Sequence, residues 1–369
     1  MIKFNFVPNY TQRHSTITVK QTTHSRIGEL DFSNIPFGKV FSDHMFVADY
    51  DGVQWKNFEI RPLERIPLHP ATMAWHYGQA IFEGMKAGIS DEGVPLLYRP
   101  QDHLHRLNAS ARRMCMPEFP EDIFIEALEQ LVYLDKAWIP QEAESALYIR
   151  PVMMATDEFV GVRSSDTFKM MIMCLPSGPY YNKPIGLLVE EHFVRAAEGG
   201  VGEAKAAGNY GASLYPAKIA KEKGYDQVMW MDAKEFKYIQ EVGTMNIFFV
   251  LDDLILTPNL SGTILKGITR DSIITLLKDE GYRVEERPVS MEEIEKAYDS
   301  GKLKEVFGSG TAAVVAQVAK IGYNGRDLVL DLNTNKVSTH MKHLINQIRK
   351  GRITDKHQWI SPIKLPALV

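Results

Sequence analysis

The sequence has little of what marks several large classes of protein. Its 369 residues include two cysteines, Cys115 and Cys174, which are too few for a disulfide framework and fit a reducing compartment. No apolar run approaches the roughly 18 residues of a membrane-spanning helix, and the longest, residues 170–175, has the length of a strand. Neither sign of charge dominates, since 42 Lys and Arg stand against 46 Asp and Glu. Binding to nucleic acid or to a membrane surface through bulk charge is therefore not expected.

The first 28 residues lack Asp and Glu and contain many Ser and Thr, a composition found in transit peptides. They have no apolar core of the kind that marks a secretory signal. Residues 15–19 alternate like a strand and not like an amphipathic helix. We therefore expect a cytoplasmic protein, and a targeting role for residues 1–28 stays open.

Signatures of several enzyme classes are also missing. There is no G-x-S-x-G elbow and no Walker A sequence. The histidines lack the number and company of metal ligands, so we expect no metal site. Residues 307–313 contain a G-x-G-x-x-A pattern after a strand-like segment, which is typical of dinucleotide binding. Too little chain follows this pattern for a mononucleotide-binding half. We therefore interpret it as a glycine-rich turn that offers N–H groups to an anion. A nicotinamide-dependent dehydrogenase is the alternative.

Hydrophobic periodicity predicts an α+β protein of two mixed α/β domains. The Pro- and Gly-rich residues 175–185 are predicted to link a smaller N-terminal domain, residues 1–174, to a larger C-terminal domain, residues 186–369. In the first domain we expect strands at 40–49, 55–66, 146–153 and 168–174, helices at 100–114 and 124–133, and a helix or buried turn at 75–87. In the second we expect strands at 186–190, 227–231, 246–251, 283–287 and 314–318, and helices at 212–223, 269–280, 290–298 and 338–350.

Three further segments contain candidate functional residues. Lys205 stands among glycines and alanines, where partial desolvation would lower its pKa and free its amine as a nucleophile, and Tyr210 lies five residues on. Glu241 lies in an apolar, strand-like context, where a carboxylate is either paired or bound to a ligand. The predicted helix start at Ile268 and Thr269 offers free N–H groups suited to phosphate. A solvated lysine, a glutamate facing water and an ordinary N-cap remain the alternatives.

A lysine, a phenol, a carboxylate and a phosphate cradle are together the groups that pyridoxal phosphate requires. The chain resembles the branched-chain amino acid aminotransferases, class IV enzymes of the fold-type IV pyridoxal phosphate group. The resemblance covers nearly the whole chain and rests on eight strings in family order: FGKVFSDHM (37–45), HYGQAIFEGMKA (76–87), LYRPQDHLHRL (97–107), ALYIRP (146–151), KAAGNYGAS (205–213), EVGTMN (241–246), LKGITR (265–270) and FGSGTAA (307–313).

The resemblance implies a role at the cofactor for each matched residue. Lys205 would form the Schiff base and move protons during catalysis. Tyr210 would hydrogen-bond the phenolic oxygen of the cofactor, and Glu241 would pair with its pyridine nitrogen. The other cofactor contacts, most of them at the phosphate, would come from Arg106, Thr244, Ile268, Thr269, Ser309 and Thr311.

The resemblance also implies one pocket for two kinds of substrate. Tyr148 and Arg150, two residues apart on one strand face, would meet the distal carboxylate of 2-oxoglutarate and glutamate. The turn at Thr311 and Ala312 would receive the α-carboxylate. Apolar walls would come from Phe37, Tyr77, Phe82, Tyr148 and Tyr180, and from Val160 and Val162 of the neighbouring subunit of a homodimer.

We therefore expect ping-pong transamination of L-leucine, L-isoleucine and L-valine with 2-oxoglutarate. A D-amino acid transaminase and an aminodeoxychorismate lyase remain alternatives of the same fold. Some animal members of the family carry a redox-active C-x-x-C after the GTA turn, and residues 313–316 here read AVVA, which excludes that thiol switch. The sequence sets neither the preferred branched-chain substrate, nor the biosynthetic or degradative direction, nor any oligomer beyond the dimer.

Overall fold

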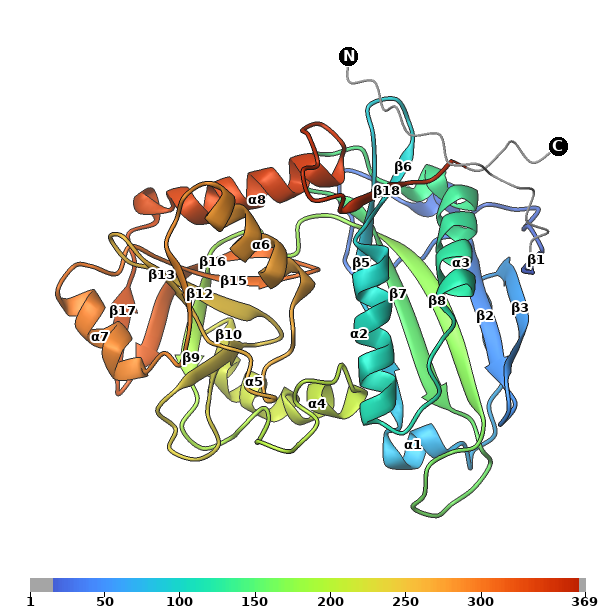
Figure 1. Ribbon diagram of the computed structural model, residues 1–369, viewed down its shortest axis with the longest axis horizontal. Coiled ribbons are helices and arrows are strands. Elements are labelled where there is room, and N and C mark those ends of the chain that lie inside the picture. Colours follow the sequence, from blue (N-terminus) through green and yellow to red (C-terminus); the bar gives the residue numbers. More distant parts are fainter. Residues whose placement is uncertain (1–15, 365–369) are drawn as a thin grey trace.

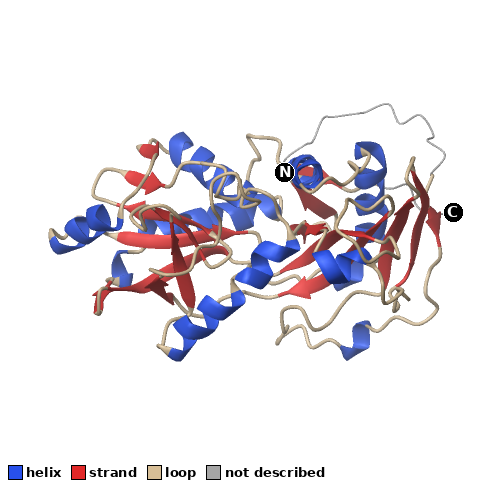
Figure 2. Ribbon diagram, turned by 90° about the horizontal axis from the view of Figure 1, so that it is seen from below, coloured by secondary structure: helices blue, strands red, loops and turns tan. Residues whose placement is uncertain are grey.

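The computed structural model describes residues 16–364, which form two lobes side by side (Figure 1). Each lobe is built on a nine-stranded sheet. The helices of both lobes lie over the faces and ends of these sheets (Figure 2). Among the described residues no helix is both long and apolar enough to cross a membrane.

The first sheet has the strand order β1-β3-β2-β8-β7-β5-β6-β18, and β4 pairs with β7. Its strands are β1 (Thr18–Val19), β2 (His44–Tyr50), β3 (Trp55–Pro62), β4 (Ala80–Phe82), β5 (Met85–Ile89), β6 (Pro95–Tyr98), β7 (Ala146–Ala155), β8 (Phe168–Ser177) and β18 (Ile360–Pro362). The helices of this lobe are η1 (Ile27–Glu29), α1 (Met73–Tyr77), α2 (Pro100–Arg113), α3 (Glu121–Leu134) and η2 (Lys136–Trp138).

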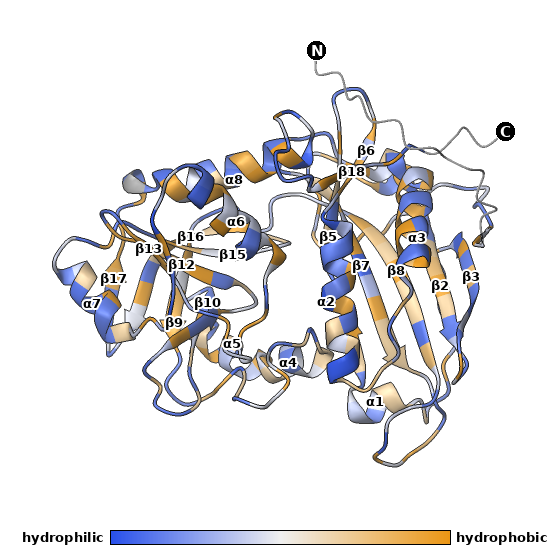
Figure 3. Ribbon diagram, in the orientation of Figure 1, coloured by the Kyte–Doolittle hydropathy of each residue, from blue (hydrophilic) through white to orange (hydrophobic). Residues whose placement is uncertain are grey.

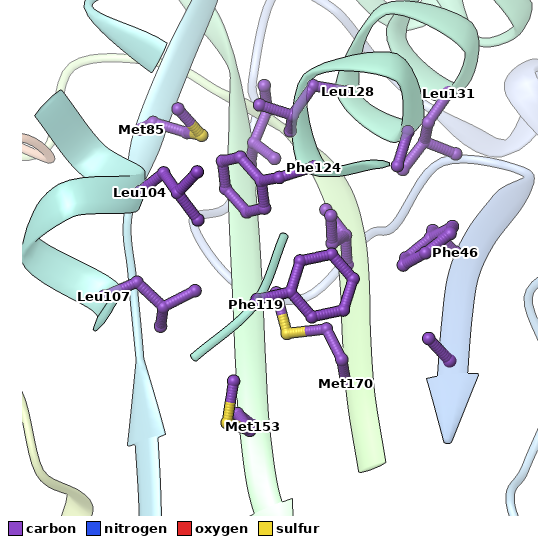
Figure 4. Packing of buried hydrophobic residues seen from close by; sticks show 14 of the residues in the cluster. Phe46, Met85, Leu104, Leu107, Phe119, Phe124, Leu128, Leu131, Met153 and Met170 are labelled. Atoms are coloured by element: carbon purple, nitrogen blue, oxygen red, sulfur yellow. The ribbon is translucent and has the colours of Figure 1, made fainter. Parts of the chain in front are cut away.

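The core of the first lobe lies between this sheet and the helices α2 and α3 (Figure 4). Proline at the first position of α2 suits a helix start, because it has no N–H to leave unpaired. Leu104 and Leu107 of α2 and Phe124 and Leu128 of α3 recur at helical spacing, so each helix turns one apolar face to the sheet. The opposite, polar face of α2 remains free to carry side chains toward the second lobe.

The second sheet has the order β11-β10-β9-β16-β15-β12-β13-β14, and β17 pairs with β16. Its strands are β9 (Ile185–Val189), β10 (Gln227–Met231), β11 (Ile239–Val242), β12 (Asn246–Val250), β13 (Ile255–Thr257), β14 (Val284–Glu286), β15 (Glu305–Gly310), β16 (Val314–Tyr323) and β17 (Arg326–Val329). The helices are α4 (Ala207–Ala212), α5 (Leu214–Glu222), α6 (Ile268–Asp279), α7 (Met291–Asp299), η3 (Leu332–Thr334) and α8 (Lys336–Arg349).

Helices α6 and α8 pack on one face of the second sheet, against the stacked rings of Phe248 and Phe307, whose centroids lie 5.0 Å apart. Their contacts come from Ile273 of α6 and from Met341 of α8, among others. The hydropathy colouring shows α8 mixing polar and apolar residues along its length, as expected for a helix with one buried face (Figure 3). The α+β class with two mixed α/β parts, predicted from the sequence, is confirmed by the two mixed sheets and the helices packed on them.

Most predicted elements are present, including α2, α3, α5, α6 and β10. Helix α7 is capped at its start, since the Ser290 side chain accepts a hydrogen bond from the Glu293 N–H. The prediction for residues 75–87 was wrong in most of its length. Helix α1 ends at Gly78, which adopts a left-handed φ of 65°, and the chain continues as strands β4 and β5 because both pair with β7.

The boundary between the two halves lies slightly later than the predicted linker start. Strand β8 continues through residues 175–177, so the connection to β9 spans residues 178–184. Strand β18, near the end of the described chain, returns to pair with β6 of the first sheet. The domain division at residues 174 and 186 stays a prediction. The question of a targeting role for residues 1–28 falls largely on residues 1–15, which lie outside the described part.

Candidate active site

A cavity of about 410 Å³ is lined by residues of both lobes. The first lobe contributes β4, β7 and α2, and the second contributes the chain around Lys205, the turn after β11, the start of α6 and the β15–β16 turn. The separate motifs of the sequence therefore meet at one place. The cavity is lined by these residues predicted from the sequence: Phe37, Phe82, Arg106, Tyr148, Arg150, Tyr180, Lys205, Tyr210, Glu241, Thr244, Ile268, Thr269, Ser309, Thr311 and Ala312.

Lys205 is anchored by its backbone to the first lobe. Its N–H donates to Ser110 Oγ of α2 at 2.9 Å, and its carbonyl accepts from the N–H of Phe82 at 3.1 Å. Its Nζ donates to Tyr210 Oη at 2.7 Å and lies 4.8 Å from the ring centroid of Phe82. Burial lowers the pKa of the lysine to about 8, helped by the nearby positive charge of Arg106. The amine is thus poised to exchange a proton near neutral pH.

Tyr210 lies beside this amine, within the short helix α4. Its ring packs against Phe82 with centroids 4.7 Å apart. Burial, together with the charge of Glu241, raises the pKa of Tyr210 to about 12, so the phenol keeps its proton at neutral pH. It is therefore available as a hydrogen-bond donor.

Arg106 of α2 is held rigidly by the fully buried carboxylate of Glu83. Its Nε and Nη2 donate to the two oxygens of Glu83 at 2.7 and 2.8 Å, and Nη1 donates to the carbonyl of Lys266 at 3.0 Å. His103 Nδ1 lies 2.8 Å from the same carboxylate. Burial alone would raise the pKa of Glu83. Arg106 and His103 outweigh this effect and hold the pKa of the carboxyl far below its usual range. Glu83 was not predicted from the sequence, although it lies in the FEGMKA string beside the predicted Phe82.

The start of α6 presents backbone donors to the cavity. Gly267 is the N-cap, and no side chain caps the helix. A Cβ built on Gly267 would lie 2.0 Å from Asn246 Oδ1, so glycine is required for the close approach of β12 to the helix start. The first N–H groups of α6, those of Ile268 and Thr269, therefore have no side-chain cap and can meet an anion in the cavity. Ser309 Oγ is buried and has no hydrogen-bond partner among the described residues.

Glu241 lies in β11 as a buried carboxylate with three polar neighbours. Its Oε2 lies 2.5 Å from Arg195 Nε, and its Oε1 accepts from Asn246 Nδ2 at 3.1 Å and from the N–H of Leu265 at 3.0 Å. Burial raises the pKa of Glu241, and Arg195 opposes that shift. Arg195 and Asn246 were not predicted, and they fix the direction in which the carboxylate faces the cavity.

One wall of the cavity combines aromatic rings with a guanidinium. Phe37 makes edge contacts with Tyr148 and Tyr180, at centroid distances of 5.3 and 5.0 Å. Arg150 Nη2 donates to Tyr148 Oη at 2.9 Å, and its Cζ lies 4.6 Å from the ring centroid of Phe82. These rings and this cation share one space, so the pocket offers both apolar surface and a positive charge.

Three predicted substrate residues lie away from this cavity in the same chain. Tyr77 is partly exposed at the end of α1, and Val160 and Val162 are exposed on the loop between β7 and β8. Other cavity-lining residues were missed by the sequence analysis: Gly84, Tyr181, Ala207, Met245, Asn246, Leu265, Gly267, Gly310 and Ala313. Most of these residues belong to the eight strings that carry the family resemblance. Their place next to a predicted site residue was the one feature of the sequence that could have identified them.

The glycines of residues 307–313 do not open a helix. Gly308 and Gly310 lie in β15, and the chain then turns directly into the antiparallel β16. A dinucleotide fingerprint requires a strand followed by a helix, so the dehydrogenase alternative is wrong. Among residues 16–364 no group of three His, Cys, Asp or Glu side chains is placed to hold a metal ion.

An amine nucleophile, a buried carboxylate and an anion cradle around one cavity define a site for pyridoxal phosphate. Residues 80–321 match the family model for class IV aminotransferases, and the chain belongs to that family. It is 43% identical over 355 residues to branched-chain-amino-acid aminotransferase 2 of Bacillus subtilis. The aligned residues cover 94% of this chain and 97% of that protein. The probable branched-chain-amino-acid aminotransferase of Staphylococcus epidermidis is 46% identical over 335 residues, with coverages of 89% and 93%.

Solved structures agree with these relatives. The branched-chain aminotransferase of Thermoproteus uzoniensis with norvaline matches with a TM-score of 0.72 at 25% identity, covering 87% of this chain and 100% of that one. The Escherichia coli branched-chain amino acid aminotransferase matches with a TM-score of 0.70 at 27% identity, with coverages of 87% and 99%. The resemblance noted from the sequence is confirmed.

Proposed function

We propose that this chain catalyses the reversible transfer of the amino group of L-leucine, L-isoleucine or L-valine to 2-oxoglutarate. The observation that carries this proposal is the pairing of the Lys205 amine with Tyr210 in a cavity whose wall joins aromatic rings to Arg150. The names of the curated relatives support the substrate class. A D-amino acid transaminase or an aminodeoxychorismate lyase finds no comparable support.

The residues present fit pyridoxal phosphate. Ser309 Oγ is buried without a partner among the described residues, and the open start of α6 faces the same cavity. With Arg106 and Thr311 these groups would hold the phosphate, and Glu241 would face the pyridine nitrogen. When bound, the cofactor supplies an aldehyde that exchanges amines and a ring that accepts electrons.

Lys205 is the group placed both to attach the cofactor and to move the proton. Its amine would take the proton from the substrate Cα and deliver it to the carbon that the cofactor contributes as its aldehyde. The lowered pKa of about 8 leaves a useful fraction of neutral amine near neutral pH. Tyr210, protonated and 2.7 Å away, would orient the amine and donate to the phenolic oxygen of the cofactor.

One pocket serves both substrates in this proposal. Phe37, Phe82 and Tyr180 would contact the apolar side chain of a branched amino acid. Arg150, oriented by Tyr148, would bind the distal carboxylate of 2-oxoglutarate. The turn at Thr311 and Ala312 would hold the α-carboxylate that both substrates share.

The exposed apolar side chains of the first lobe support a homodimer. Val160 is 65% exposed and Val162 is 90% exposed on the β7–β8 loop. This loop lies against the segment that leads into α1, since the N–H of Phe159 donates to the carbonyl of Ala71 at 3.1 Å. Exposed apolar side chains gathered in this way mark a protein interface. The valines would complete the pocket of the neighbouring subunit. We place the enzyme in the cytoplasm, because both its cysteines are free thiols.

The first test is the visible spectrum of the purified protein with pyridoxal phosphate. L-Leucine alone should shift the absorption band of the bound cofactor, and 2-oxoglutarate should restore it. Lys205→Ala should abolish this cycle, whereas Lys221→Ala, which changes an exposed lysine of α5, should retain it. A band that ignores L-leucine and responds to D-alanine would overturn the substrate assignment.

The dimer has its own test. The double change Val160→Asp and Val162→Asp should give a monomer in sedimentation analysis and a large loss of turnover. Val53→Asp, at another exposed valine in the β2–β3 turn, is the matched control and should remain dimeric. A wild-type protein that sediments as a monomer would contradict the proposal.

A further inference from the structure

A buried lysine stands directly behind the turn at Thr311 and Ala312. Lys86 of β5 is only 3% exposed, and its Nζ donates to the carbonyl of Ala312 at 2.8 Å. The lysine belongs to the first lobe and the turn to the second, so this contact joins the two lobes beside the active site. The catalytic roles proposed above do not involve Lys86.

A second buried cation lies close to it. Arg349, the last residue of α8, is 5% exposed, and its Cζ lies 4.7 Å from the ring centroid of Tyr98. Its Nε and Nη1 are buried and have no hydrogen-bond partner among the described residues. A Cβ built on Gly88 would lie 2.5 Å from the carbonyl oxygen of Arg349, so the helix end packs tightly on β5.

The two cations line the same small cavity, of about 10 Å³. Gly88, Ser145 and Asn346 are also in its lining. A volume of this order is close to the smallest that admits one water molecule, so a larger halide ion requires the lining side chains to move apart slightly. Polar donors and two positive charges therefore surround space for one small ion or one water molecule.

The charges around this cavity do not balance. Its lining contains one carboxylate among the described residues, that of Glu144, which is partly exposed and pairs with Lys342 at 2.8 Å. Lys350, also in the lining, directs its ammonium to the carbonyls of Gln141 and Glu142. The carbonyl end of α8 supplies only about half a negative charge. Burial lowers the pKa of both Lys86 and Arg349, which reflects the cost of holding two cations without an anion.

We propose that Lys86 and Arg349 enclose a binding site for one small monovalent anion of the halide class, immediately behind the Thr311-Ala312 turn. The anion offsets one of the two buried positive charges, and it accepts hydrogen bonds from the unpaired guanidinium nitrogens of Arg349. The site stands independently of the proposed function. Its effect on catalysis rests on that function, because Lys86 also supports the turn assigned to the substrate α-carboxylate. Occupancy of the site should then lower the KM for L-leucine and the KM for 2-oxoglutarate together.

The direct experiment is a crystal of the holoenzyme soaked in sodium bromide, with anomalous scattering recorded at the bromine edge. The expected result is one bromide peak in the cavity between Lys86 and Arg349. The same soak of Arg349→Gln should lack the peak, whereas Arg352→Gln, which removes a partly exposed cation just beyond α8, should keep it. A wild-type cavity that holds water or nothing under these conditions overturns the proposal.

Thermal unfolding gives a second readout that needs neither a crystal nor turnover. Replacing gluconate by chloride at constant ionic strength should raise the Tm of the holoenzyme in a saturating way, by about 3 °C. Arg352→Gln should behave like the wild type, and Arg349→Gln and Lys86→Met should show no chloride effect. An equal effect in all variants would mean general salt stabilisation and would overturn the site. If bromide binds and the Tm responds while L-leucine is not a substrate, the proposed function fails and the anion site remains.

Discussion

The change Glu83→Gln tests whether the carboxylate behind Arg106 organises the site. Glu83 is fully buried and accepts hydrogen bonds from Arg106 Nε and Nη2 at 2.7 and 2.8 Å. Its Oε2 also lies 2.8 Å from His103 Nδ1. A glutamine keeps the size of the side chain and removes its charge. Arg106 is then left as a buried cation without its counterion, which costs about 3–5 kcal/mol of folding free energy.

The assay is urea unfolding of the apoenzyme at neutral pH, together with titration of the apoenzyme with pyridoxal phosphate. We expect a lower unfolding midpoint and weaker cofactor binding, because the guanidinium loses its fixed orientation. Glu292→Gln is the control. It removes an exposed carboxylate that pairs with Lys296 on α7, and it should leave both quantities unchanged.

The pH dependence sharpens this prediction. Because the pKa of Glu83 is lowered in the folded protein, its stabilisation is present above the ordinary carboxyl pKa and is lost as the pH falls below that range. The difference between wild type and Glu83→Gln should therefore shrink in acid. An unfolding midpoint equal to that of the wild type at neutral pH, or a difference that grows in acid, would refute the reasoning.

Three further predictions concern the cavity itself. Arg150→Met should raise the KM for 2-oxoglutarate by roughly ten- to a hundredfold, because a charge-assisted contact is lost. The KM for L-leucine should stay nearly unchanged. Equal increases in KM for both substrates, measured in separate half-reactions, would contradict the assigned role. Gly84→Ala should disturb the same pair, because its Cβ would lie 2.0 Å from Tyr148 Oη, and steady-state kinetics should show a higher KM for 2-oxoglutarate. The rate of cofactor uptake by the apoenzyme should rise with pH with a midpoint near 8, as the Lys205 amine loses its proton. A midpoint near the ordinary lysine pKa would show that the amine is not desolvated.

Much of the fold was predictable because its signals are local. The apolar stripe of α2 and the serine N-cap of α7 are set by residues a few positions apart, and the helices predicted at 100–114 and 290–298 are both present. Residues 75–87 were misread because a short apolar run fits a buried helix as well as a strand. Only their pairing with β7, about seventy residues away in sequence, decides that β4 and β5 form.

The candidate site divides in the same way. The strings around Lys205, Glu241 and Thr269 contain candidate groups for the cofactor, because its chemistry needs those residue types, and the structure brings these residues to one cavity. The sequence did not identify the residues that orient them. Glu83, Arg195 and Asn246 act on side chains distant in sequence or across a turn, so the contacts they make appear only in the folded chain, although Glu83 and Asn246 lie in matched strings.

By itself, then, the sequence determined the family, the cofactor class and the identity of the chemical groups, since these depend on residue types and on spacing along the chain. The tertiary structure decided which groups share a cavity, how far the pKa of Lys205 falls, and that Lys86 and Arg349 are buried together behind the substrate turn. Desolvation and charge pairing arise only when distant segments pack against one another and exclude water. These properties therefore belong to the fold and not to any stretch of its sequence.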